Sequence, residues 1–240
     1  MTTTRIALWS GPRNVSTALM YSFRQRSDTT VVDEPLYAHY LTRSGVVHPG
    51  KAEVLAAQDP EGEQIVRDVI LGPVPTPVLF IKNMAHHLGG LEWSFLTQLH
   101  NVILTRDPAE MLPSLVRQLP NPDLEGTGLP VQVELLEAML ADDIDPLVID
   151  SRLLLMDPAR VLGKLCTAVG IEFEEAMLSW EPGPVPEDGV WAPYWYDSVH
   201  RSSGFAIYQP RDEPVPEHVE PLLAKAAPLY ERLLAYALHP

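Results

Sequence analysis

The chain has 240 residues, enough for one domain with a full hydrophobic core, and its 46% apolar content is that of a soluble globular protein. Its formal charge of −15 argues against nucleic acid or an anionic membrane as a partner. No apolar run reaches the length of a membrane span, the N-terminus lacks a signal-peptide pattern, and the lone Cys166 excludes an internal disulfide. We therefore expect one domain over residues 1–240, located in the cytoplasm.

The first predicted element is a buried strand, because residues 6–9 form a short apolar run. A turn at residues 10–14 follows, and helical periodicity begins after Thr17. The first turn of a helix carries unpaired N–H groups and the positive end of the helix dipole, so this layout favours a bound phosphate or sulfate. The residues predicted to form the anion site are Gly11, Pro12, Arg13, Asn14, Ser16 and Thr17.

The same stretch departs from the phosphate-binding loop of nucleotide kinases. When that pattern is laid on the chain from Gly11, Ser16, Thr17 and Ala18 stand where glycine, lysine and a magnesium-binding hydroxyl are required. These mismatches argue against a P-loop-type phosphoryl transferase, which we keep as an alternative hypothesis. Two further alternatives are a nucleotide-binding module without catalysis and an ordinary strand-turn-helix unit with no bound ligand.

The stretch resembles the 5′-phosphosulfate-binding loop of sulfotransferases that use 3′-phosphoadenosine 5′-phosphosulfate. In that family a strand leads to a basic residue, a hydroxyl pair and a helix. Arg13 stands where the family usually has lysine, and Ser16 and Thr17 match its paired hydroxyls. The loop is spelt differently from the family's usual sequence around Asn14 and Val15.

A second strand is predicted over residues 29–32, and Glu34 follows it directly before Pro35. Open α/β sheets bind their ligands at the carboxyl ends of the strands. Glu34 is therefore either a solvated surface carboxylate or a catalytic base. The resemblance favours the base, because several sulfotransferase branches carry a catalytic glutamate in such a Glu-Pro segment. Tyr37, His39 and His48 follow in a polar segment that could wall an acceptor pocket.

The third predicted strand, residues 78–81, is followed by Lys82, His86 and His87. A lysine at a strand end can neutralise a transferring anion. In the family, a Lys-x-His segment here supplies a lysine near the sulfuryl group and a histidine base. The histidines of this chain lie four and five residues after Lys82. We keep His86 as the alternative base and expect His87 to serve packing.

A fourth strand is predicted over residues 101–105, followed by Arg106 and by a helix start in which Asp107 caps and Pro108 is the first helical residue. Ser114 lies eight residues after Arg106, close to the same helix face two turns further on. This spacing matches the arginine and serine that bind the 3′-phosphate in the family.

The rest of the chain predicts a proline- and glycine-rich loop over residues 119–130, a helix over 131–140, a strand over 147–150 and a helix from 157 to about 169. The aromatic stretch 191–196 either covers the sheet edge, which we favour, or contacts a ligand. Arg201 and Gly204 weakly resemble a late phosphate-binding loop of the family. A terminal helix is predicted over 216–237.

Alternating strands and helices predict an α/β fold: a three-layer sandwich with a mostly parallel central sheet. The resemblance implies that this fold is like that of the P-loop nucleotide hydrolases. The resemblance implies an enzyme that moves a sulfuryl group from 3′-phosphoadenosine 5′-phosphosulfate to a hydroxyl or amine of a small molecule. It implies no metal. The acceptor and the oligomeric state are left open.

Overall fold

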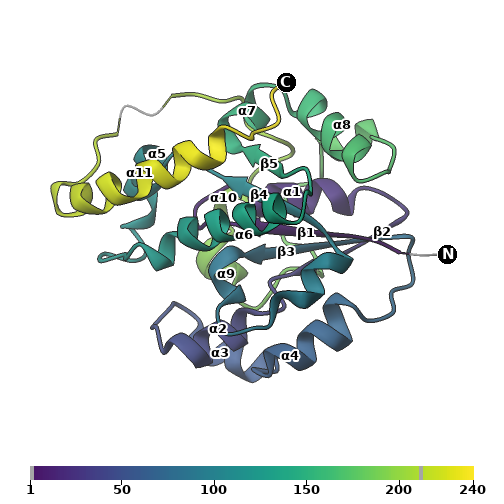
Figure 1. Ribbon diagram of the computed structural model, residues 1–240, viewed down its shortest axis with the longest axis horizontal. Coiled ribbons are helices and arrows are strands. Elements are labelled where there is room, and N and C mark those ends of the chain that lie inside the picture. Colours follow the sequence, from purple (N-terminus) through teal and green to yellow (C-terminus); the bar gives the residue numbers. More distant parts are fainter. Residues whose placement is uncertain (1–2, 211–212) are drawn as a thin grey trace.

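The computed structural model describes residues 3–210 and 213–240, and the strands within them form a five-stranded sheet (Figure 1). All neighbouring strands are parallel, in the order β2-β3-β1-β4-β5. The strands are β1 Thr4–Ser10, β2 Thr29–Asp33, β3 Val78–Met84, β4 His100–Thr105 and β5 Leu147–Asp150. The predicted α/β fold with a parallel sheet is confirmed.

Helices cover both faces of the sheet, because successive side chains of β1 enter opposite hydrophobic cores. One core includes side chains of α1 (Ser16–Arg24) and α8 (Pro158–Ala168). The other includes side chains of α6 (Leu129–Ala141) and α11 (Glu220–Leu234). These are the three layers that the alternation of strands and helices predicts.

The other helices are shorter and connect these elements. The α-helices are α2 Tyr37–Ser44, α3 Lys51–Ala57, α4 Gly62–Ile65, α5 Pro108–Leu115, α7 Ser151–Met156, α9 Ala192–Trp195 and α10 Asp197–His200. Short 3-10 helices cover Ala85–Leu88, Trp93–Gln98, Glu125–Thr127, Glu175–Leu178 and Glu217–Val219, and a π-helical turn covers Val66–Ile70.

Several predicted boundaries were wrong. β3 runs on to Met84, so Lys82 lies inside the strand rather than after it. The segment 37–44 forms α2, although we expected only a polar segment there. Its sequence looks polar because only Tyr37, Ala38 and Leu41 of the eight residues are buried. α7 was not predicted, and α6 begins at Leu129, inside the predicted loop. Tertiary packing stabilises structure that local periodicity does not show: α6 packs against β4, α7 against β5, and α2 against α3 and the 3-10 helix Ala85–Leu88.

Parallel strands end at the same edge of the sheet, so the segments that follow them meet there. The segments after β1, β2, β4 and β5 bring Arg13, Glu34, Arg106 and Arg152 to this edge. Within residues 3–210 and 213–240, no helix is long and apolar enough to cross a membrane. The same residues contain no group of three or more histidine, cysteine, aspartate or glutamate side chains that could hold a metal ion.

Candidate active site

The N-terminus of α1 points its backbone N–H groups toward the strand ends without a side-chain cap. Val15 occupies the capping position and makes no side-chain hydrogen bond, and the first turn contains no acidic residue. Serine, threonine, asparagine or aspartate at this position would normally occupy these donors. The uncapped turn, with Ser16 and Thr17 as its first residues, is therefore equipped to bind an anion.

The preceding loop is shaped by backbone constraints. Arg13 has a left-handed backbone with φ of 53°, a strained conformation for a side-chain-bearing residue. The Asn14 amide donates to the Leu104 carbonyl at 3.0 Å and its oxygen accepts from the Val15 N–H at 2.9 Å. Asn14 therefore fastens the loop to β4. A Cβ on Gly11 would lie 2.7 Å from the Thr127 carbonyl oxygen, so this close approach requires glycine.

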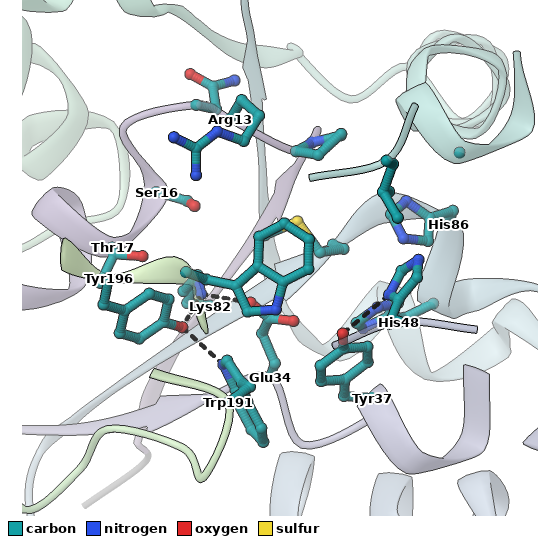
Figure 2. Close-up of a pocket in the computed structure, with 17 residues that line it drawn as sticks. Arg13, Ser16, Thr17, Glu34, Tyr37, His48, Lys82, His86, Trp191 and Tyr196 are labelled. Carbon is teal, nitrogen blue, oxygen red and sulfur yellow. Dashed lines mark hydrogen bonds and ion pairs between the residues drawn. The ribbon is translucent and has the colours of Figure 1, made fainter. Parts of the chain in front are cut away.

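Two cavities adjoin at this loop. The Glu34 cavity is lined by Glu34, Lys82, His86 and Trp191 among others (Figure 2). The Arg106 cavity is lined by Arg106, Ser114 and Arg152 among others. Both linings include Arg13, Asn14, Thr17, Trp195 and Tyr196. A molecule bound in one cavity can therefore present a group to a molecule in the other, in front of the α1 N-terminus.

In the Arg106 cavity, the predicted arginine and serine come together with the first loop. The Arg13 guanidinium donates to the Ser114 hydroxyl at 3.0 Å, and Arg106 donates to the Arg13 carbonyl at 2.7 Å. Asp107 caps α5 by accepting from the Ala109 N–H at 2.8 Å, as predicted. The segments after β1 and β4 thus bring Arg13 and Arg106 together in one lining, which also contains Glu110, 3.5 Å from the Arg106 guanidinium.

Arg152 is a cation of this cavity that the sequence analysis missed. It lies two residues after the end of β5, and its guanidinium approaches Asp107 at 3.3 Å and Glu110 at 3.2 Å. It also lies over the Tyr208 ring, 5.6 Å from the centroid. The signal was available, because a basic residue just after a strand is the pattern that singled out Arg106.

Arg201 and Gly204, which we predicted to bind phosphate together, lie in different surroundings. The Arg201 side chain is 70% exposed, pairs with Asp197 at 2.5 Å and lines neither cavity. Gly204 lines the Arg106 cavity and forms a bridge with Ser179. In this structure, Gly204 lies at the predicted site and the side chain of Arg201 does not.

In the Glu34 cavity, the lysine and the glutamate form a buried ionic cluster with Asp33 and Tyr196. The Lys82 ammonium donates to Glu34 at 2.5 Å, to Asp33 at 3.0 Å and to the Tyr196 hydroxyl at 2.5 Å. The side chains of Lys82 and Asp33 are each 1% exposed. The ammonium has three protons, and each has an acceptor. Glu34, like Arg13, has a left-handed backbone, with φ of 39°.

Burial sets the ionisation of this cluster. Burial raises the pKa of Glu34, although the Lys82 charge opposes the rise. Burial lowers the pKa of Lys82, but the charges of Asp33 and Glu34 outweigh it, so its pKa is raised overall. Lys82 therefore stays protonated, and Glu34 is a more basic carboxylate than one on the surface.

His86 lies deep in the same cavity and is held neutral. Burial, with a smaller contribution from His48, lowers the pKa of His86 to about 3. Its Nδ1 is buried with no hydrogen-bond partner among the described residues. His87 stacks on the rings of Tyr37 and Tyr40, at 5.1 and 4.8 Å between centroids, which is a packing role.

The aromatic stretch does more than cover the sheet edge, the role favoured from sequence. Trp191, Trp195 and Tyr196 line the Glu34 cavity, and Trp195 and Tyr196 line the Arg106 cavity as well. Trp191 donates from its indole nitrogen to the Tyr196 hydroxyl at 2.9 Å. The stretch still lies against edge strand β2, because Tyr196 donates to Asp33 at 2.7 Å.

Comparison with known proteins identifies the family. A family model described as a sulfotransferase domain matches residues 4–237, and the chain belongs to this family of sulfotransferase enzymes. The fold agrees with a sulfotransferase domain from the curacin biosynthetic pathway, with a TM-score of 0.51, 16% identity and 99% of each chain covered. A sulfotransferase from Alicyclobacillus acidocaldarius gives a TM-score of 0.55 at 12% identity, covering 100% of this chain and 98% of the other.

A longer relative is found in Arabidopsis thaliana. It is named branched-chain-amino-acid aminotransferase-like protein 2 and is 39% identical over 235 residues, which is 98% of this chain. The chain spans 42% of the length of that relative. The name describes the longer protein, and we infer no aminotransferase activity for this chain.

Proposed function

We propose that this enzyme transfers a sulfuryl group from 3′-phosphoadenosine 5′-phosphosulfate to a hydroxyl or amine of a small molecule. The observation that carries the proposal is the junction of the two cavities at Arg13 and Thr17, in front of the uncapped N-terminus of α1. The donor lies in the Arg106 cavity and the acceptor in the Glu34 cavity. The sulfuryl group passes between them.

The donor needs two anion sites, and two adjacent groups of residues support this assignment. Arg13, Ser16 and Thr17, with the N–H groups of α1, hold the 5′-phosphosulfate. Arg106 and Ser114 hold the 3′-phosphate, and Arg152 adds a third positive charge to the same cavity. Glu110 pairs with Arg106 and Arg152 in the same lining, so, among its described residues, three cations and one carboxylate surround this cavity in a strongly negative chain.

Transfer proceeds in line. The acceptor oxygen or nitrogen forms a bond to sulfur while the bond from sulfur to the bridging oxygen of the 5′-phosphate breaks. The acceptor proton passes to the Glu34 carboxylate, and the leaving group is adenosine 3′,5′-bisphosphate. Positioning and electrostatic stabilisation carry such a reaction.

Lys82 keeps Glu34 ionised and ready to accept the proton, because an ammonium beside a carboxylate favours its charged form. It can contact the bridging oxygen only by exchanging one of its three partners. Arg13 and the α1 N–H groups are the donors that face the transferring group directly.

The acceptor cavity indicates an uncharged acceptor with an aromatic or apolar body. Its walls include Tyr37, Trp191 and Trp195, and burial lowers the pKa values of His48 and His86, so both rings are neutral. Burial lowers the pKa of His87 as well, so no histidine among the described residues of this lining is positive, and the Lys82 charge is paired with Glu34 and Asp33. The hydroxyl or amine of the acceptor must reach Glu34 between these rings.

Ligand-induced stabilisation tests the donor assignment. Adenosine 3′,5′-bisphosphate should raise the melting temperature without metal, since a ligand at a hundredfold excess over its Kd adds about 2.7 kcal/mol. ATP with magnesium is the comparison. Stronger stabilisation by ATP and magnesium would instead support a phosphoryl transferase. Release of the bisphosphate from the donor in the presence of 2-naphthol tests turnover.

A further inference from the structure

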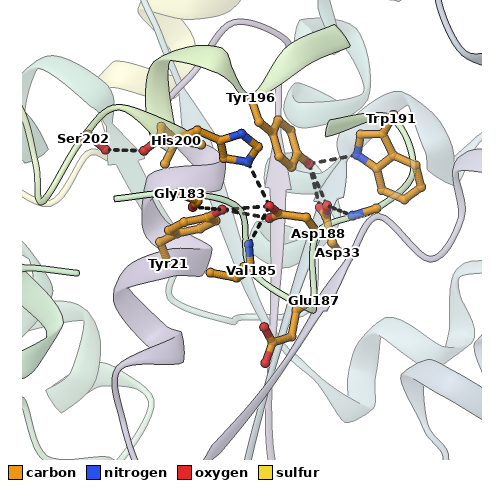
Figure 3. Close-up of polar contacts among 12 residues, drawn as sticks. Tyr21, Asp33, Gly183, Val185, Glu187, Asp188, Trp191, Tyr196, His200 and Ser202 are labelled. Atoms are coloured by element: carbon orange, nitrogen blue, oxygen red, sulfur yellow. Dashed lines mark hydrogen bonds and ion pairs between the residues drawn. The ribbon is translucent and has the colours of Figure 1, made fainter. Parts of the chain in front are cut away.

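Asp33, the last residue of β2, is buried and accepts several hydrogen bonds. Its two oxygens accept from the Lys82 ammonium at 3.0 Å, from the Tyr196 hydroxyl at 2.7 and 2.9 Å, and from the Gly189 N–H at 3.0 Å (Figure 3). Three donors from β3 and from the segment 189–196 thus converge on one buried carboxylate. Asp33 itself lines neither cavity.

Through these contacts, Asp33 connects Lys82 to the aromatic segment 189–196, which we call the aromatic wall. Asp33 holds the segment 189–196 at both of its ends, at Gly189 and at Tyr196, and Trp191 adds a hydrogen bond to the same Tyr196 hydroxyl. Trp191, Trp195 and Tyr196 form one wall of the Glu34 cavity. The position of this wall and the position of the Lys82 ammonium therefore depend on the same side chain.

We propose that Asp33 is a positioning residue that fixes the aromatic wall 189–196 and the Lys82–Glu34 pair in one arrangement. It touches neither donor nor acceptor and acts through Lys82 and Tyr196. The effect of Asp33 on catalysis rests on the proposed sulfuryl transfer, whereas its anchoring of the segment 189–196 does not.

A second carboxylate provides a matched control. Asp188 accepts from the Tyr21 hydroxyl at 2.8 Å and the Val185 N–H at 3.0 Å, and it contacts His200 at 2.9 Å. Figure 3 shows it beside the same segment, with no drawn interaction to Asp33. The Asp188 side chain thus anchors the segment 183–188, which precedes the aromatic wall, and it makes no contact with Lys82, Glu34 or Asp33.

Hydrogen exchange tests the anchoring without requiring turnover. In Asp33→Asn, the amides of residues 189–196 should exchange at least about tenfold faster, because two anchors to a charged group are weakened at once. In Asp188→Asn, the faster exchange should centre on residues 183–188. Unchanged exchange over 189–196 in a folded Asp33→Asn protein overturns the anchoring. Should Asp33→Asn fail to fold, Tyr196→Phe, which removes one anchor, must show the same local increase.

The pH profile tests the coupling to the base. Glu34 faces Lys82 on β3, Asp33 on β2, Tyr196 after α9 and Tyr37 on α2. Burial is the main cause of its raised pKa, and the Asp33 charge adds to the rise. Loss of that charge lowers the pKa of Glu34, so the acid limb of the rate profile should move to lower pH in Asp33→Asn.

The rate profile is measured as bisphosphate release from the donor with 2-naphthol as acceptor. Asp188→Asn should keep the wild-type acid limb. Affinity for adenosine 3′,5′-bisphosphate, measured by calorimetry, should stay within about twofold of wild type in Asp188→Asn, whose carboxylate lines neither cavity. In Asp33→Asn the same measurement reports the displacement of Trp195 and Tyr196, which also line the Arg106 cavity. An acid limb that does not move in Asp33→Asn overturns the coupling. A wild-type protein that neither binds adenosine 3′,5′-bisphosphate nor turns over contradicts the proposed function, while the hydrogen-exchange result still decides the anchoring.

Discussion

Arg106 donates a hydrogen bond to the backbone carbonyl of Arg13 at 2.7 Å, and this contact joins the two segments that we propose to bind anions. The two residues are far apart in the chain and follow different strands, β1 and β4. Because β1 and β4 are neighbours in the sheet, their carboxyl ends place both segments at the same point. The order of the strands in the sheet therefore creates the Arg106 cavity.

Arg106 should distinguish nucleotides that carry a 3′-phosphate. Arg106→Ala removes a charge-assisted hydrogen bond, so affinity for adenosine 3′,5′-bisphosphate should fall by about 1.5–3 kcal/mol. Affinity for adenosine 5′-phosphosulfate should change far less. Calorimetry with both ligands measures the difference. Ser114→Ala is the companion variant and should show a smaller loss with the same preference. Equal losses for both ligands would mean that Arg106 only supports the Arg13 loop.

Gly11 should be intolerant of a side chain. A Cβ there would lie 2.7 Å from the backbone oxygen of Thr127, and backbone cannot move aside as a flexible side chain can. Gly11→Ala should therefore cost about 1–3 kcal/mol of stability through overpacking. Gly163 in α8 is the matched control, because a Cβ there meets nothing within 4 Å. Gly163→Ala should stabilise the protein by about 1 kcal/mol, through higher helix propensity. Urea denaturation measures both changes.

The sequence predicts the parts of the site that depend on strand ends. Arg13, Glu34 and Arg106 each directly follow an apolar run or a strand-end turn, and the family resemblance added Ser114 by spacing. Local pattern cannot show which distant segment returns to the sheet. Tyr196 meets Lys82, 114 positions earlier in the chain, and only the packed fold reveals that contact. The same reason explains why the aromatic stretch was assigned mainly to the sheet edge.

His86 should make stability depend on pH. Its pKa falls from 6.5 to about 3 on folding, chiefly through burial, so the unfolded chain binds a proton that the folded protein does not. Stability is therefore lost as pH falls below 6.5, by about 2 kcal/mol at pH 5 from this group alone. His86→Gln should reduce the loss between pH 7 and pH 5 in urea denaturation. His100→Gln, at an exposed position, should leave it unchanged. An identical loss in His86→Gln would assign the pH dependence to other groups.

Glu34 and His86 compete for the role of base, and their surroundings favour Glu34. Both line the same cavity. Burial lowers the pKa of His86 to about 3, which makes the ring a weak proton acceptor, whereas burial raises the pKa of Glu34. A more basic carboxylate transfers a proton more effectively, provided that Lys82 keeps it ionised.

Glu34→Gln should therefore lower kcat by about 10²–10⁴-fold, because glutamine keeps the shape of the side chain but cannot accept the proton. Wild-type activity should rise with pH as Glu34 ionises, and the variant should lack this acid limb. Affinity for adenosine 3′,5′-bisphosphate should stay near wild type, since Glu34 does not line the Arg106 cavity. His86→Asn should lower kcat much less. The reverse ranking would assign the base to His86, and two nearly normal variants would show that the acceptor reaches the cavity already deprotonated.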